Sequence, residues 1–145
     1  MKVLLQRVTT ASVTVDGEQI AQIDHGLLLL VGAARRDTTD AARALATKVS
    51  RLRVFAGDTG HFDRSLLDTG GEALVVSQFT LVGDTRKGRR PSFTEAEAPE
   101  QARALVEEFA ATLEQLGVQV SRGRFGAHML VDLANDGPVT LLLEG

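Results

Sequence analysis

Ser77, Gln78, Phe79 and Thr80 form the first of three segments whose residue types could carry chemistry. They follow the apolar run 73–76, which is typical of a buried strand. Where such a strand ends, backbone N–H groups and small hydroxyls are available to hydrogen-bond a ligand. Ser and Thr side chains at this position can equally bond to the local backbone and do nothing more. The residue types alone leave both a ligand site and a plain strand end open.

A second segment concentrates positive charge in an otherwise acidic chain, which has 16 Lys and Arg against 19 Asp and Glu. Clustered cations attract phosphate groups and release the counterions that surround a nucleic acid. A run of charge can also be a solvated loop with no ligand. The cluster consists of Arg86, Lys87, Arg89 and Arg90.

The third segment is residues 135–140, Asn-Asp-Gly-Pro-Val-Thr, near the C-terminus. Asp, Gly and Pro in succession before an apolar run are typical of a turn. On local evidence we therefore interpret Gly137 and Pro138 as turn residues.

The chain lacks the patterns of the common metal, nucleotide and triad enzymes. His25, His61 and His128 are far apart, without the i, i+4 spacing of a helical metal site. No cysteine is present, the glycines form no phosphate-binding fingerprint, and no Gly-x-Ser-x-Gly turn occurs. We expect no metal and no cofactor.

Hydrophobic periodicity indicates the elements that must position these segments. It predicts strands over 3–15, 19–23 and 26–32, with a hairpin turn at Asp16 and Gly17. Two amphipathic helices are expected, over 39–53 with Thr38 or Thr39 as the N-cap, and from Pro99 to Gly117. Further strands are predicted at 73–79, 118–122, 128–134 and 139–143. This order predicts the α+β class: a single domain over residues 1–145, with a curved, mostly antiparallel or mixed sheet covered by the two helices.

Composition narrows the class of protein. A chain of 145 residues with 43% apolar residues can bury one core without disulfides. The net charge of −3 disfavours a general nucleic-acid coat protein, although a local basic patch can still bind one end of an RNA. Its apolar runs are too short to span a membrane and Arg7 interrupts the N-terminal one, so we expect a cytoplasmic protein.

Taken together, the motifs resemble those of the D-aminoacyl-tRNA deacylase family, also called the D-tyrosyl-tRNA deacylases. The resemblance runs nearly end to end and keeps the order of the motifs. Two positions depart from it, with Asp63 where many relatives have Asn and His128 where many have Asp. The matching segments are residues 6–8, 48–55, 76–81, 84–93, 123–127 and 135–140.

The resemblance implies a barrel-like sheet and a homodimer with its active sites at the subunit interface. The catalytic segment would be Ser77, Gln78, Phe79 and Thr80. Gly137 and Pro138, joined by a cis bond and braced by Arg7, would reach in from the other subunit as a chirality filter.

The substrate implied is aminoacyl-tRNA, held by its 3′ end and acceptor stem. Phe125 and Met129 would flank the terminal adenosine. His128, next to Met129, is one of the two positions that depart from the family pattern. We assign the contacts to the backbone of the stem to the four cations of the second segment: Arg86, Lys87, Arg89 and Arg90.

The implied reaction is hydrolysis of the ester of D-aminoacyl-tRNA, and of glycyl-tRNA mischarged on tRNA-Ala, with rejection of the L form. Backbone N–H groups around Phe79 and Thr80 are the candidate oxyanion donors, and the 2′-OH of the RNA would help to activate water. Thr80 is then a lining group rather than a nucleophile. Two alternatives stay open: a non-catalytic RNA-binding module, and a hydrolase of free amino-acid esters that needs no basic loop.

Overall fold

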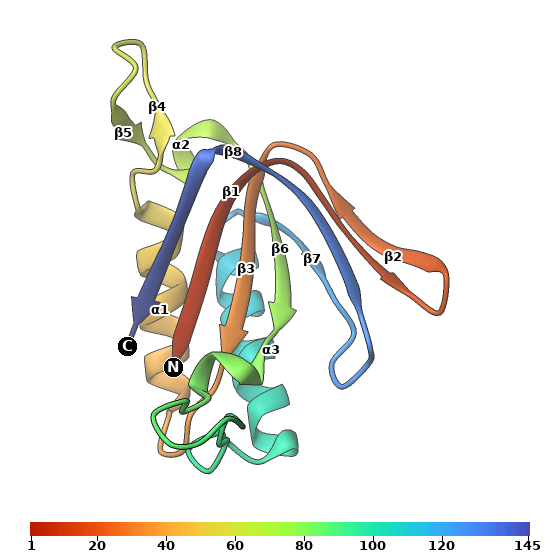
Figure 1. Cartoon of the computed structure of the whole chain (residues 1–145). Helices are drawn as coiled ribbons and strands as arrows, with labels where there is room; N and C mark the ends of the chain where they lie inside the picture. Colours follow the sequence, from red (N-terminus) through yellow and green to blue (C-terminus); the bar gives the residue numbers. More distant parts are fainter.

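A mixed sheet of six strands curls around itself in the computed structural model, which describes all residues 1–145 (Figure 1). The strand order is β2-β1-β3-β6-β7, and β8 pairs with the other edge of β1. β3, β6 and β7 run parallel to one another, whereas the β1 pairings are antiparallel. The elements are β1 (Lys2–Val15), β2 (Glu18–Ile23), β3 (Gly26–Gly32), α1 (Thr39–Arg51), β4 (Phe55–Ala56), β5 (Phe62–Arg64), α2 (Leu66–Thr69), β6 (Glu72–Ser77), the 3₁₀ turn η1 (Phe79–Val82), α3 (Pro99–Gln115), β7 (Gln119–Arg122) and β8 (Leu130–Glu144).

Local signals in the sequence account for the principal helices and the first hairpin. The Thr38 side chain accepts a hydrogen bond from the Ala41 N–H at 3.1 Å and so caps α1. Pro99 occupies the first turn of α3, where its missing N–H costs nothing. Asp16 and Gly17 both have positive φ, as the tight turn between β1 and β2 requires.

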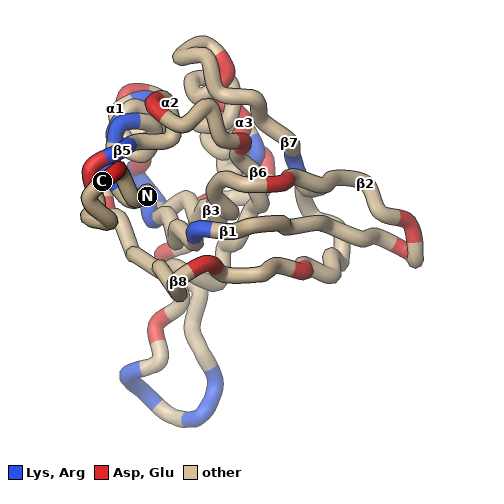
Figure 2. Tube along the Cα trace, turned by 90° about the horizontal axis from the view of Figure 1, so that it is seen from above, with Lys and Arg blue, Asp and Glu red and all other residues tan.

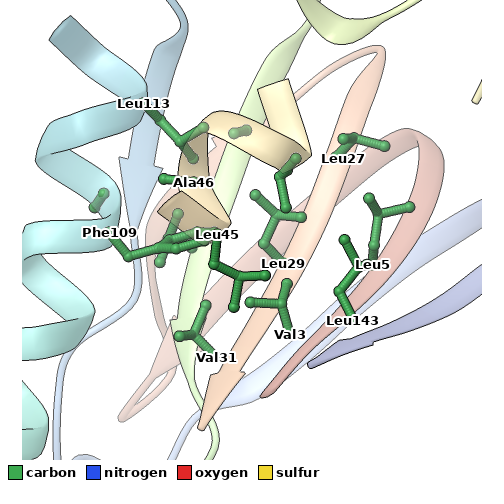
Figure 3. Packing of buried hydrophobic residues seen from close by; sticks show 14 of the residues in the cluster. Val3, Leu5, Leu27, Leu29, Val31, Leu45, Ala46, Phe109, Leu113 and Leu143 are labelled. Atoms are coloured by element: carbon green, nitrogen blue, oxygen red, sulfur yellow. The ribbon is translucent and has the colours of Figure 1, made fainter. Parts of the chain in front are cut away.

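The larger core lies between the sheet and the two long helices, which cover one face of it (Figures 1 and 3). Val3 and Leu5 of β1 face this core, whereas Val8 and Val13 face a second, smaller one. β1 therefore passes from one core to the other where the sheet curls over. β3 is buried on both faces, as its continuous apolar run predicts. The α+β class with a curved, barrel-like mixed sheet and two main helices is confirmed.

Several predicted boundaries differ from the structure. The strand predicted over 73–79 ends at Ser77, because the chain turns into η1. The helix expected to reach residue 53 ends at Arg51. The strands predicted at 128–134 and 139–143 are one strand, β8, interrupted by a bulge.

No helix of the structure is both long enough and apolar enough to cross a bilayer.

Candidate active site

A cavity of about 460 Å³ opens at the carboxyl ends of the parallel strands β3 and β6. The edge where parallel strands end is a common ligand site in α/β sheets. The start of α3 forms one wall of the cavity, and the segment between β7 and β8 forms another. The lining is mostly apolar: Val31, Ala33, Val76, Ser77, Gln78, Phe79, Ala96, Glu97, Pro99, Ala102, Val106, Phe125, Gly126, Ala127, Met129 and Val131.

Three of the four predicted catalytic residues line this cavity, and Thr80 lies next to them in η1. The Gln78 N–H donates to the Val31 carbonyl at 2.8 Å and so fixes the end of β6 against β3. Phe79 is 53% exposed and packs edge-on against Phe93, with the ring centroids 5.0 Å apart. Contacts with β3 and Phe93 thus fix the segment, and its remaining surface lines the cavity.

The backbone of η1 leaves donors free. In a 3₁₀ turn the first N–H groups have no carbonyl partner within the turn, and no side chain caps this one. The N–H groups of Phe79 and Thr80 are therefore available, while the Leu81 N–H bonds to the Gln78 carbonyl at 3.3 Å. The Thr80 hydroxyl accepts a hydrogen bond from the Gln78 side-chain amide. This arrangement suits stabilisation of a developing negative charge.

Phe125 and Met129 face the same cavity from the segment after β7. The Arg103 guanidinium of α3 lies 5.0 Å from the centre of the Phe125 ring, within the range of a cation–π contact. The Arg124 N–H donates to the Met129 sulfur at 3.4 Å. Both predicted flanking residues are therefore held in place at the wall.

Gly137 and Pro138 lie at the other end of the sheet from this cavity. The register pairs Asn135 with Val8 but Thr140 with Gln6, so the residues between them bulge out of β8. Asn135 closes the base of the bulge, because its side-chain oxygen accepts from the Val139 N–H at 2.7 Å. Along the strands, Val8 and the end of β3 are separated by roughly 15–20 Å. The exposed pair therefore does not reach the cavity of its own chain.

Arg7 contacts this bulge with its side chain. Its Nε donates to the Asp136 carbonyl at 2.8 Å, and its Nη1 donates to the Val54 carbonyl at 2.7 Å. The Gly137–Pro138 peptide bond is cis, and Gly137 has a φ of +136°. The local sequence predicts a turn at residues 135–140, whereas the structure has a bulge within a continuous strand.

The basic loop, which comprises residues 84–92, projects from the body of the molecule, and its Lys and Arg residues are coloured blue (Figure 2). Asp84 and Ser92 exchange backbone hydrogen bonds of 2.7 and 2.8 Å, which close its base. Arg86 forms a two-pronged ion pair with Asp84, and its hydrogen bonds lower the pKa of that carboxyl to about 2. The remaining cations, Lys87, Arg89 and Arg90, are exposed and form no ion pair.

Sequence reasoning missed the wall of the cavity that α3 contributes. Ala102 and Val106 form part of the apolar stripe of that helix, and a stripe looks the same whether it faces a core or a cavity. Glu97 was also missed, and it is the only acidic side chain in the lining. No signal in the sequence distinguishes either from ordinary core or surface positions.

The fold and this cavity define an α+β protein with two helices on one face of a curved sheet, and with a ligand-sized cavity that no His, Cys or Lys lines. The family model described as D-Tyr-tRNA(Tyr) deacylase matches residues 4–144. The D-aminoacyl-tRNA deacylase of Roseiflexus castenholzii is 59% identical over 144 residues, which cover 99% of this chain and 92% of that protein. The chain belongs to this deacylase family.

Two solved structures share the fold. One, titled c-Myc DNA Unwinding Element Binding Protein, has a TM-score of 0.95 and 42% identity, covering 100% of this chain and 99% of the other. The second, titled as a probable eukaryotic D-amino acid tRNA deacylase, has a TM-score of 0.83 and 18% identity, covering 98% and 97%. The prediction that the chain is a hydrolase of the deacylase family is confirmed.

Proposed function

We propose that this D-aminoacyl-tRNA deacylase, a hydrolase of translation quality control, binds the terminal adenosine and its esterified amino acid in the cavity beside η1. A volume of about 460 Å³ is in the range of sites for small ligands, and its apolar lining suits an adenine ring. The observation that carries the proposal is that the N–H groups of Phe79, which lines the cavity, and of the adjacent Thr80 have no partner within η1. The reaction takes place in the cytoplasm, where charged tRNA is used.

The proposed step is attack of water on the ester carbonyl. The bond from the carbonyl carbon to the ribose oxygen breaks, the water supplies the new oxygen, and the leaving ribose oxygen takes up a proton. The two N–H groups of η1 stabilise the oxyanion, and the neighbouring ribose hydroxyl helps to activate the water. An aminoacyl ester is reactive enough that placement and oxyanion stabilisation suffice. This accounts for a cavity lined by no His, Cys or Lys.

Selection of the D form is proposed to come from Gly137 and Pro138 of a second subunit. The pair is exposed on its own chain and far from its own cavity, which suits donation to a partner. The outer part of β8 also exposes large apolar side chains, with Leu130 at 63% and Leu142 at 52%. Exposed apolar surface of this kind is typical of an interface between subunits. The proposed protein is therefore a homodimer with both sites at the interface.

The filter is proposed to act by exclusion. Carbonyls of the Gly137–Pro138 pair accept a hydrogen bond from the ammonium group of the substrate in one handedness. In the other handedness the substrate side chain would collide with the pair. An achiral glycyl ester has no side chain to collide, so glycyl-tRNA mischarged on tRNA-Ala is a substrate as well. Arg7 supports the pair through its bond to Asp136.

The experiment that tests this function compares D-tyrosyl-, L-tyrosyl- and glycyl-tRNA under single-turnover conditions. We expect rapid release of D-tyrosine and glycine and no release of L-tyrosine above the uncatalysed rate. Equal rates for the two tyrosyl forms would contradict the proposed filter.

The alternative of a non-catalytic RNA-binding module is contradicted by membership of a family of enzymes. A hydrolase of free amino-acid esters is distinguished by the basic loop. For a tRNA deacylase, changing Lys87, Arg89 and Arg90 to Gln should weaken turnover of D-tyrosyl-tRNA in a salt-dependent way, whereas a hydrolase of free esters should lose no activity.

A further inference from the structure

A shallow depression of about 580 Å³ adjoins the cavity on the side of the connection between β3 and α1. The two hollows share Ala96, Glu97 and Pro99, so their rims meet. Figure 1 shows this connection at the same end of the molecule as η1, the basic loop and the start of α3. A chain leaving the cavity over this shared rim crosses the depression. Its lining is Arg35, Arg36, Phe93, Ala96, Glu97, Ala98 and Pro99.

Backbone contacts fix the two arginines at this rim. Residues 33–35 pair with residues 95–97: the Arg35 N–H donates to the Glu95 carbonyl at 2.9 Å, and the Glu97 N–H donates to the Ala33 carbonyl at 3.1 Å. The Asp37 carboxylate accepts from the Ala34 N–H at 2.7 Å and closes the following turn. Arg35 and Arg36 therefore project from an anchored segment.

Neither arginine has an anionic partner within the chain. Asp37, the nearest acid in sequence, pairs with the ammonium group of Met1 at 2.7 Å. The Glu97 carboxylate accepts from the Ala98 N–H at 2.7 Å. Arg35 and Arg36 are both exposed and form no ion pair, in contrast to Arg86. Their charges are free for an external anion.

The position of the depression indicates which anion. Phe93 lines it and contacts Phe79 at the cavity, and Phe93 directly follows Ser92 at the base of the basic loop. Arg35 and Arg36 therefore lie next to the cavity, and the base of the basic loop adjoins the same depression through Phe93. Arginine binds phosphate through paired N–H donors, and a partly exposed aromatic ring can stack on a base.

We propose that Arg35 and Arg36 bind phosphodiester groups of the single-stranded 3′ end of the substrate RNA, where it leaves the cavity. The inference rests on the proposed function, because it takes the terminal adenosine to lie in the cavity. Arg35 and Arg36 would form a second RNA-binding region besides the basic loop. This second region would bind the unpaired strand rather than the acceptor stem.

The test uses the full chain with Arg35 and Arg36 both changed to Gln. The matched control changes Lys48 and Arg51 to Gln, which removes the same charge from exposed, unpaired positions in the second half of α1. Three D-tyrosyl esters serve as substrates: adenosine, which has no phosphate, a CCA trinucleotide, and full tRNA. KM is measured for each over a series of salt concentrations.

For the Arg35 and Arg36 variant we expect KM for the trinucleotide and for tRNA to rise about tenfold at low salt, with a salt slope smaller by about 1.4. KM for the adenosine ester and kcat for all three esters should stay unchanged. The control variant should match the unmodified chain on all three substrates.

Three outcomes would overturn the inference: an unchanged KM for the trinucleotide ester, an equal rise in KM for the adenosine ester, or an equal rise in KM in the control variant. A loss on tRNA alone would place the arginines on the paired stem and also overturn it. Failure of the unmodified chain to release D-tyrosine from any ester would instead contradict the proposed function.

Discussion

Thr80 is the residue at which side-chain and backbone chemistry can be separated. Its hydroxyl is already engaged by the Gln78 amide, whereas its N–H has no partner within η1. If the backbone donates to the oxyanion, Thr80→Ala should keep kcat within about threefold of the unmodified enzyme. Replacing the same residue by its α-hydroxy analogue, which removes only the N–H, should lower kcat about 100-fold.

Semisynthesis provides the α-hydroxy analogue, and single-turnover kinetics on D-tyrosyl-tRNA measure the rate of each of the two variants. The Thr80→Ala variant is the matched control, because it keeps the N–H and loses the hydroxyl. Loss of all activity in Thr80→Ala with normal substrate binding would return Thr80 to the role of nucleophile.

The candidate site residues could be placed from the sequence only through the resemblance, because the residue types of the segment 77–80 also fit a plain strand end. In the structure Ser77, Gln78 and Phe79 line the cavity with Thr80 beside them, and Phe125 and Met129 face it from another segment. Pro99, Ala102 and Val106 could not be predicted as cavity residues, since an apolar helix face carries no sign of what it faces.

At the scale of elements, β8 shows what periodicity misses. The residues around Gly137 and Pro138 have the composition of a turn, so the sequence divides one strand into two. The structure keeps the strand continuous because β1 pairs with both halves, and the Asn135 side chain takes the place of a ladder bond at the bulge. Long-range pairing of this kind overrides local turn preference.

The basic loop offers a test of its own geometry. The Arg86 side chain, and then its backbone N–H, hold the pKa of Asp84 at about 2, below its ordinary value of 3.8. A carboxyl with a lowered folded pKa stabilises the folded loop above its ordinary pKa, and this contribution is lost as pH falls through about 2. The pinched base of the loop should therefore persist throughout the range from pH 4 to 8.

An NMR titration of the Asp84 carboxyl measures this directly. Arg86→Gln should move the midpoint upward toward the ordinary value, while Arg89→Gln should leave it in place. A midpoint near the ordinary value in the unmodified chain would mean that the ion pair does not form in solution. Because Arg86 is already neutralised, we also expect Arg86→Gln to weaken tRNA binding less than Arg89→Gln does.

For the whole molecule, the separation between the cavity and the Gly137–Pro138 bulge predicts how two inactive variants behave when their subunits are mixed. Both belong to every chain, yet roughly 15–20 Å of sheet lies between them. If each site combines the cavity of one subunit with the bulge of the other, a heterodimer of two different inactive variants contains one fully intact site.

Ala127→Trp, which fills the cavity, and Pro138→Glu, which puts a bulky anion on the bulge, are suitable inactive variants, because Ala127 lines the cavity and Pro138 is exposed. After the two are mixed and their subunits exchanged, half of the dimers are mixed and each has one working site of two. The mixture should recover about a quarter of the unmodified activity. Two variants of the cavity, Ala127→Trp and Ala96→Trp, provide the control and should recover none. Activity in the first mixture no higher than in the control would mean that each chain completes its own site, and sedimentation of the unmodified chain as a monomer would mean the same.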